Sequence, residues 1–340
     1  DAGPDLAGKD KLFNVARVIY SLGNGSYAGG LFTDSEFGAG HNRAAAGDVS
    51  LRLGEHHRWS ASFIGTETRS ADGLSRRSGL AGQTTYGYDS KRYSANLQLE
   101  HYDDGFHMDT AFYNRTGYTG GNLYLGRSFY PDAKRWPWFK RFVPFVFATG
   151  GRDRPEGGTE LIALAGLRFN FTRQGFLRLD SGHGHEPWRN REWPLHFYRA
   201  MADAQLYGWL GLHGRVEFYP RNTYYDPESP FTGQELRYWV SGVFQPNDRI
   251  RQEISYNRDS FSRLNGRGHV YTVNLINSKT TYQFDRRFSA RAIVRYDSSR
   301  NRILCDLLGA WEPVPGTVAY VGYGALYERR GWDGEDWIPG

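Results

Sequence analysis

Arginines and carboxylates that recur at alternate positions are the side chains best suited to chemistry in this sequence. Arg199 and Asp203 flank small apolar residues, and Arg215 and Glu217 follow a few residues later. A guanidinium group keeps its charge and presents a planar fork that suits carboxylate or phosphate. The pattern indicates a wet surface of mixed charge in which arginine dominates. The residues assigned to this surface are Arg168, Arg199, Asp203, Arg215, Glu217, Arg237, Arg251, Glu253, Arg291 and Arg295.

The segment 180–193 places histidines and a carboxylate at a spacing that can bind metal. It contains His183, His185 and Glu186, and alternate histidines on an extended segment can share an ion. His196 is the nearest further ligand, and no complete ligand set is evident. We therefore expect an exposed outer loop with incidental histidines, without a metal site or another cofactor.

Two aromatic features could bind sugar or lipid. Trp188 and Trp193 are candidates for stacking on a sugar ring, with a position at the membrane interface as the alternative. The basic and aromatic stretch 130–142 could hold anionic lipid or lipopolysaccharide phosphate. For this stretch we favour a turn anchored in the headgroup region by Trp136 and Trp138.

An outer-membrane hydrolase is the enzymatic alternative. Such an enzyme needs a nucleophile or activated water beside a histidine and an acid. His101, Asp103 and Asp104 lie close along the chain, as do Ser181 and His183. Neither group forms a specific motif, because strand ends are rich in these residue types, and we expect no enzymatic activity. The single cysteine also excludes haem attachment through a CxxC motif.

The elements that must position these groups are strands. Residues 92–101 and 288–297 alternate between apolar and polar types, as strands with one apolar and one polar face do. About 19 such segments, each of roughly 8 to 13 residues, cover nearly the whole chain. No run approaches the roughly 20 apolar residues of a membrane-spanning helix. The sequence predicts an all-β protein with a single domain, residues 1–340.

Segment length, aromatic positions and small residues favour a transmembrane barrel over a soluble sandwich or propeller. Strands of about 9 to 11 residues cross a bilayer at a tilt. Aromatic residues cluster near segment ends, as Tyr102, Tyr219 and Tyr296 do, where the interfacial girdles of a barrel lie. Ala200 and Ala202 would make a thin sandwich core but cost little against lipid. We predict a large antiparallel β-barrel of about 18 to 26 strands in the complete protein.

The connections predict which rim of the barrel faces which side. Bacterial barrels have short periplasmic turns and longer outer loops. Tight connections are predicted at 172–175, 211–214, 245–249, 284–287 and 312–316. Long outer loops are predicted at 181–195, 219–234 and 258–268. After the predicted strand 317–327, residues 328–340 are expected to form another outer loop, and the chain is expected to be incomplete at one or both ends.

Three stretches carry a resemblance to a known family. Residues 15–54, 274–297 and 315–328 look like an uncharacterised family of large bacterial outer-membrane β-barrels. In that family the barrel often follows a periplasmic module that resembles a family-9 carbohydrate-binding domain. The resemblance covers most of the chain and supports the barrel fold. The module, the first barrel strands and the final strand of the family have no counterpart here, which supports an incomplete chain.

The charge of the chain also bears on the class of partner that it binds. The formal net charge is +5, and arginine is spread along the chain among acids, so a nucleic-acid partner is not expected. We expect a pore or envelope-assembly scaffold in the bacterial outer membrane, in contact with the lipid bilayer and lipopolysaccharide. Its arginine-rich lumen would suit anionic or polar solutes such as oligosaccharides. The alternatives are a sheath for a periplasmic or envelope partner protein, including an electron-transfer partner, a hydrolase, and a soluble β protein that binds carbohydrate.

Overall fold

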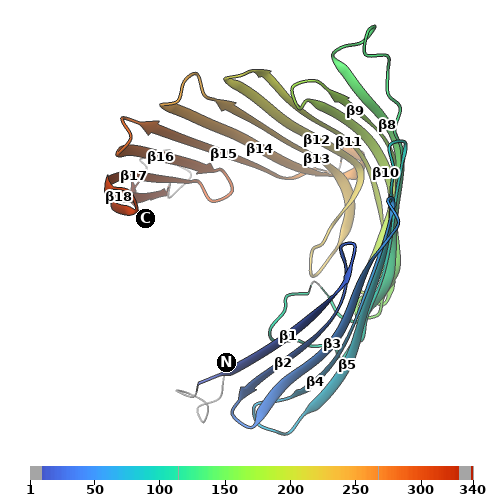
Figure 1. Ribbon diagram of the computed structural model, residues 1–340. Helices are drawn as coiled ribbons and strands as arrows, with labels where there is room; N and C mark the ends of the chain where they lie inside the picture. The colour runs from blue at the N-terminus through green and yellow to red at the C-terminus, as the bar shows by residue number, and fades with distance from the viewer. Residues whose placement is uncertain (1–9, 114, 267, 329–337, 340) are drawn as a thin grey trace. The chain divides into compact units, whose positions relative to one another are not determined.

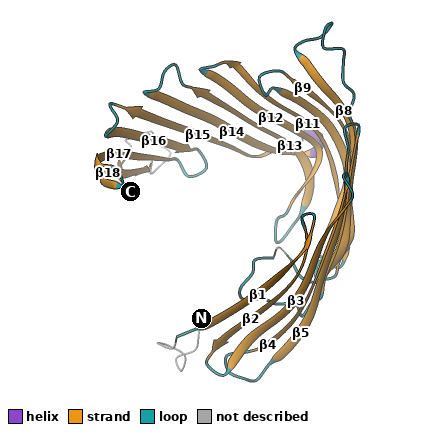
Figure 2. Cartoon of the chain, in the orientation of Figure 1, coloured by secondary structure: helices purple, strands orange, loops and turns teal. Residues whose placement is uncertain are grey.

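The computed structural model describes residues 10–113, 115–266, 268–328 and 338–339. These residues form long antiparallel strands joined by turns, with one short 3-10 helix at Leu264–Gly266 (Figure 2). No helix among them is long and apolar enough to cross a membrane. The expected all-β antiparallel fold is confirmed, and the long strands span 10 to 17 residues. They pack as two compact units, formed by the described parts of 1–128, 144–165 and 183–193, and of 129–143, 166–182 and 194–340.

The strands follow one another along the chain (Figure 1). They are β1 (Leu12–Gly23), β2 (Ser26–Phe37), β3 (Gly40–Leu53), β4 (His57–Arg69), β5 (Arg76–Asp89), β6 (Tyr93–Tyr102), β7 (Tyr118–Arg127), β8 (Phe139–Asp153), β9 (Gly158–Phe171), β10 (Phe176–Trp188), β11 (Arg191–Tyr207), β12 (Leu210–Tyr224), β13 (Phe231–Phe244), β14 (Ile250–Arg263), β15 (His269–Gln283), β16 (Phe288–Asp297), β17 (Arg302–Val314), β18 (Thr317–Glu328) and the two-residue β19 (Ile338–Pro339).

In the first unit, each strand from β1 to β7 pairs with the next in antiparallel register. The alternation in the sequence becomes two faces. Phe63, Leu97 and Leu123 lie on the apolar face and are 57%, 39% and 39% exposed. A soluble sandwich buries its apolar face, whereas a transmembrane barrel presents it to lipid. The exposure of these side chains therefore favours the membrane.

The second unit repeats this arrangement. The strands from β11 to β18 pair consecutively and antiparallel. Val240 and Ile254 on their apolar face are 50% and 51% exposed. On the polar face, the register places Arg199, Glu217, Arg237 and Asp259 directly opposite one another across β11 to β14. We call these four residues the charged row.

Several predicted connections are confirmed and others are wrong. Turns join β9 to β10 at 172–175, β13 to β14 at 245–249 and β15 to β16 at 284–287, as expected. The expected turn at 211–214 is wrong, because β11 ends at Tyr207 and β12 has already begun at Leu210. The turn expected at 312–316 is shorter, since β17 continues to Val314.

The three long outer loops are also mostly strand. Residues 181–195 form the end of β10 and the start of β11, joined by a tight turn at Arg189 and Asn190. Both turn residues have left-handed backbones, with φ of 53° and 59°, as a two-residue hairpin turn requires. Similarly, 219–234 keeps only 225–230 as a connection, and 258–268 keeps only the short segment around the 3-10 helix. Most of the outer loop expected at 328–340 lies outside the described residues.

Candidate functional site

The predicted arginine-rich surface lies on the polar face, where the structure joins many of its members. Arg199 lies between two carboxylates: its Nη2 is 2.8 Å from Asp180 Oδ1, and its Nη1 is 3.7 Å from Glu217 Oε1. Arg178 Nε donates to the other oxygen of Asp180 at 2.7 Å. Arg215 Nε lies 3.6 Å from Glu217 Oε2. Opposite charges that face each other on adjacent strands stabilise a sheet, as Arg199 and Glu217 do here, whereas Arg178 with Asp180 and Arg215 with Glu217 pair within one strand.

A second cluster surrounds Glu235, which sequence reasoning did not select. The Glu235 carboxylate is almost fully buried and lies 2.6 Å from Arg237 Nη2. It also accepts hydrogen bonds from the Tyr271 hydroxyl at 3.1 Å and from Asn222 Nδ2. Arg237 Nε lies 3.4 Å from Asp259 Oδ2, so one guanidinium serves two acids. Three donors therefore compensate the burial of the Glu235 charge, as a buried carboxylate requires.

The remaining predicted residues of this surface are less constrained. Arg251 donates to Glu253 at 2.7 Å, and both side chains are partly exposed. Asp203 accepts a hydrogen bond from His213, a partner that the sequence did not suggest. Arg295 donates to Asn277 at 3.3 Å, and Arg168 donates to Asn170 at 3.1 Å. Arg291 also lies on the polar face, where it pairs in register with Thr281 and Leu308. Its side chain is exposed.

Acids and bases on this face differ in exposure. The side chains of Asp180, Glu217 and Glu235 are 0%, 7% and 1% exposed. Those of Arg215 and Arg237 are 47% and 42% exposed. Asp180, Glu217 and Glu235 therefore lie lower in the side-chain layer than the guanidinium groups of Arg215 and Arg237. Elsewhere on the face the difference is smaller or absent: Asp259 and Glu253 are 36% and 33% exposed, and Arg178 and Arg199 are 27% and 22% exposed. A solute that approaches Arg215 and Arg237 meets arginine before these three buried acids.

The two tryptophans proposed for sugar stacking lie at the ends of the β10–β11 hairpin. Trp193 is only 4% exposed, and its Nε1 donates to the Trp188 carbonyl at 3.3 Å. The Arg191 guanidinium lies 4.2 Å from the Trp193 ring centre. The Arg189 guanidinium lies 4.6 Å from the Trp188 ring centre. The partly exposed Trp188 is the better placed of the two to meet a sugar.

His185 of this hairpin lies beside one acid and one hydroxyl group. Among the described residues, no group of three or more histidines, cysteines or acids is placed to hold a metal ion. His185 Nε2 lies 3.7 Å from Glu192 Oε2 and 3.4 Å from Thr159 Oγ1. Ser181 and His183 are alternate residues of β10.

His101 and Asp103, considered for a hydrolase, do meet. His101 Nε2 is 3.0 Å from Asp103 Oδ1, and His101 Nδ1 is 2.6 Å from Thr119 Oγ1. Arg154 Nη1 also donates to Thr119 Oγ1, at 3.1 Å, so this hydroxyl is held by two partners. Asp104 turns away and accepts from Arg154 Nε at 3.3 Å. These hydrogen bonds fix the side chains as a polar cluster. They do not leave a nucleophile free beside a base, as a hydrolase would require.

The basic and aromatic stretch 130–142 joins an aromatic cluster. The ring centre of Trp138 is 5.8 Å from that of Phe139 and 5.9 Å from that of Phe171. Phe142 lies 5.1 Å from Phe169. Trp136 and Trp138 remain 42% and 51% exposed. Exposed tryptophans over an aromatic base suit the interfacial girdle expected for this turn.

One candidate element was missed by sequence reasoning: the connection between β6 and β7 folds back over the polar face of the first unit. Phe106 and Met108 are buried at 3% and 6% exposure against Ala44 and Ala81. Gly79 permits this contact, because a Cβ there would come within 2.2 Å of Phe106 N. We call the described residues 103–113 the docked loop.

Buried polar groups fix the docked loop to the sheet. The Asn42 amide donates to the His107 carbonyl at 2.8 Å and accepts from the Asp109 backbone N–H at 2.9 Å. Asp109 Oδ2 accepts from the Ser35 hydroxyl at 2.6 Å and from Lys11 Nζ at 2.7 Å. The docked loop thus covers part of the polar face, as inward-folded loops do in barrels whose lumen is narrowed or plugged.

We predict that acid loosens the docked loop. Burial alone would raise the pKa of Asp109, but hydrogen bonds from Lys11, Ser35 and His107 outweigh it and leave the pKa below its ordinary value. A carboxylate with a lowered pKa stabilises the folded state above its unfolded pKa of about 3.9, and this contribution is lost as the pH falls through the lowered value. Hydrogen exchange of the 103–113 amides, corrected for intrinsic rates, should be slow at pH 6 and should accelerate below about pH 4.

Asp109→Asn provides the control for this effect. It removes the titrating group, so exchange in the loop should be faster than in the parent at pH 6 and should change little on acidification. If the two proteins show the same pH profile, Asp109 does not control docking.

Comparison with known proteins finds similarity in the fold. No protein-family model and no curated protein matches the sequence. A variant of the ferric enterobactin receptor PfeA from Pseudomonas aeruginosa, solved with enterobactin, superposes with a TM-score of 0.55 at 8% identity, over 94% of this chain and 66% of the receptor. The siderophore receptor PirA from Acinetobacter baumannii gives a TM-score of 0.52 at 7% identity, over 94% of this chain and 65% of the receptor.

The fold is that of an outer-membrane β-barrel. PirA from Pseudomonas aeruginosa gives a similar result, with a TM-score of 0.55 at 8% identity over 95% of this chain. The chain spans slightly less than two thirds of the length of the first two receptors. These likenesses confirm the expected fold class and, with it, a place in the bacterial outer membrane. They leave the carbohydrate-binding module a prediction.

Proposed function

We propose that the chain forms wall strands of an outer-membrane transport barrel, and that its polar face lines a path for anionic or polar solutes. The observation that carries the proposal is the difference in exposure between buried carboxylates and extended guanidinium groups on this face. Arginine is suited to phosphate and carboxylate groups because of its planar fork. A lumen lined in this way attracts anions and repels cations.

A shallow pocket on the same face offers a place for such a solute. Its volume is about 290 Å³, and its lining includes Arg215, Arg237 and Trp239 together with Val273 and Leu275. Arg258 and the carboxylate of Asp259, which is paired with Arg237 at 3.4 Å, also line it. Two guanidinium groups beside an aromatic ring and an apolar wall can hold an anionic group and the body of a sugar together. The proposal therefore includes polar oligosaccharides that carry acidic groups.

The similar receptors are named for siderophores, which supports a transport role. The docked loop adds a second feature of a transport barrel, since it narrows the polar side of the first unit. We accordingly favour a solute path over a purely structural scaffold.

Arg291→Gln tests the proposal without disturbing a buried charge. Arg291 is exposed on the polar face, so the free energy of unfolding should change by less than about 0.5 kcal/mol. Uptake of an anionic oligosaccharide into liposomes containing the full-length protein should slow relative to uptake of a neutral one of equal size. Equal uptake of both sugars by the parent protein would contradict the proposal.

A further inference from the structure

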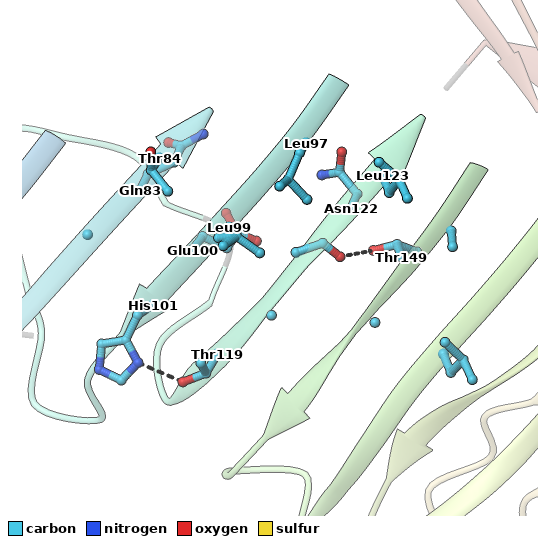
Figure 3. A pocket seen from close by; sticks show the side chains of 16 residues that line it. Gln83, Thr84, Leu97, Leu99, Glu100, His101, Thr119, Asn122, Leu123 and Thr149 are labelled. Atoms are coloured by element: carbon cyan, nitrogen blue, oxygen red, sulfur yellow. Dashed lines mark hydrogen bonds between the residues drawn. The ribbon is translucent and has the colours of Figure 1, made fainter. Parts of the chain in front are cut away.

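A groove of about 790 Å³ crosses the apolar face of the first unit between β5 and β9. Its lining includes Leu97, Leu99 and Leu123, which Figure 3 labels. Leu161 of β9 also lines it. The same face is exposed along its length, as expected for contact with lipid. The groove therefore differs from the polar-face pocket in position and in chemistry.

The groove forms where glycines, which have no side chain, lie between leucines. The register aligns Leu99, Gly121 and Gly150 across three strands. A Cβ at Gly121 would come within 2.7 Å of Leu99 Cδ2, and one at Gly150 within 3.2 Å of Leu161 Cδ1. The two leucines lean over the glycines from opposite sides. The result is a channel between leucine ridges, and extended hydrocarbon fits such a surface.

One end of the groove is polar and basic. The row that closes it consists of Gly82, His101, Thr119 and Arg152, which face one another in register across β5 to β8. His101 and Thr119 are joined by a hydrogen bond at this end (Figure 3). Arg154 is fixed beside them through Thr119 Oγ1 and the Tyr102 carbonyl, at 3.1 and 2.7 Å.

Arg152 is the free cation of this row. It is exposed, and no carboxylate within the described ranges forms an ion pair with it. Arg154, in contrast, shares its charge with Asp104. Arg152 lies beyond the groove lining, two residues after Gly150 and in register with Thr119. An unpaired guanidinium next to the polar end of an apolar groove is complementary to a molecule with an acyl chain and a phosphate.

The polar end lies on the outer side of the membrane. In the first unit, β1–β2, β3–β4 and β5–β6 are joined by the short connections 24–25, 54–56 and 90–92. The opposite rim has the two-residue turn 38–39 and the connections 70–75, 103–117 and 154–157, of which 103–117 is the longest. The rim with the short turns has one longer connection, 128–138, between β7 and β8. Short turns mark the periplasmic rim, so His101, Thr119 and Arg152 lie at the outer leaflet.

We propose that this groove binds the lipid A part of lipopolysaccharide, with one acyl chain between the leucine ridges and a phosphate on Arg152. The inference rests on the outer-membrane barrel of the proposed function but not on its solute. It assigns His101 and Thr119 to the support of a headgroup site. Arg152 provides the direct charge-assisted contact.

Titration of the full-length protein with lipid A, followed by native mass spectrometry, tests the proposal. Arg152→Gln should weaken lipid A binding about tenfold, the effect of losing one charge-assisted hydrogen bond. Ala148→Phe, which places a ring in the groove, should weaken it about fivefold through lost acyl contact. Dephosphorylated lipid A should bind the parent protein about as weakly as lipid A binds Arg152→Gln.

Matched variants control for charge and bulk. Arg221→Gln removes an exposed arginine of β12 that does not line the groove, and Val146→Phe adds a ring on β8 outside it. Both should bind lipid A as the parent does. Equal binding by all variants, or binding of phosphatidylglycerol as tight as that of lipid A, would overturn the proposal. Liposome uptake should be unchanged in Arg152→Gln, so failure here is distinguishable from failure of the proposed function.

Discussion

Arg237→Gln should lower the free energy of unfolding by about 3 kcal/mol, the lower end of the usual cost of leaving a buried charge unpaired, because the Arg237 guanidinium is itself 42% exposed. Glu235, with a side chain only 1% exposed, would lose its nearest cation, 2.6 Å away. Tyr271 and Asn222 would still donate hydrogen bonds, but neither carries a positive charge. Urea unfolding of the full-length protein in detergent micelles measures the difference.

The Arg251–Glu253 pair provides the control. Its side chains are 49% and 33% exposed, and exposed pairs contribute at most about 1 kcal/mol. Arg251→Gln should therefore change the free energy of unfolding by less than about 1 kcal/mol. If Arg237→Gln lowers the free energy of unfolding by as little as Arg251→Gln does, the ion pairs of Arg237 do not stabilise the sheet.

Gly79→Val should release the docked loop from the sheet and raise the conductance of the full-length protein. Any Cβ at position 79 would overlap the backbone at Phe106, which lies against the strand there. Valine itself is a good strand residue, so β5 should keep its pairing. Undocking exposes Phe106 and Met108, whose burial is worth about 1.5 to 3 kcal/mol each. Single-channel recording measures the conductance, and hydrogen exchange of 103–113 reports the release.

Gly47→Val tests whether release depends on the contact itself. A Cβ at Gly47 meets nothing within 4 Å, so this variant adds the same side chain to β3 without touching the loop. Its conductance and exchange should match those of the parent. A Gly79→Val protein whose loop amides stay protected would show that the loop is held elsewhere.

The sequence alone predicts much of the wall, because each strand within the bilayer meets lipid on one side and water on the other. That difference forces the alternation seen at 92–101 and 288–297, and these segments become β6 and β16 almost residue for residue. Turns with strong local signals, such as 245–249, also follow from the sequence. The alternation weakens in 180–193 although the backbone remains a strand there. Polar residues on both faces of the β10–β11 hairpin, as at His183 and Glu186, are the feature that misled the sequence interpretation.

The docked loop could not be predicted from periodicity, since it forms contacts far along the chain. One signal was available. The polar face of β3 to β5 contains small or uncharged residues at Ala44, Thr66, Gly79 and Ala81, where the second unit has arginines and acids. A wall that lines water is expected to carry charged or large polar side chains. A wall that is covered by a packed loop needs small, uncharged ones. Similarly, the burial of Glu235 could not be predicted locally: Arg237 is two residues away, but its other partners, Asn222 and Tyr271, come from β12 and β15.

The sign of ion selectivity tests the central claim, that extended arginines over buried carboxylates make the polar face a path for anions. The full-length protein would be inserted into a planar bilayer of neutral lipid with a tenfold potassium chloride gradient, and the reversal potential would be measured. We expect a potential of the sign set by chloride, and a smaller one for Arg291→Gln. A reversal potential of the sign set by potassium, or a protein that inserts but does not conduct, would contradict the account.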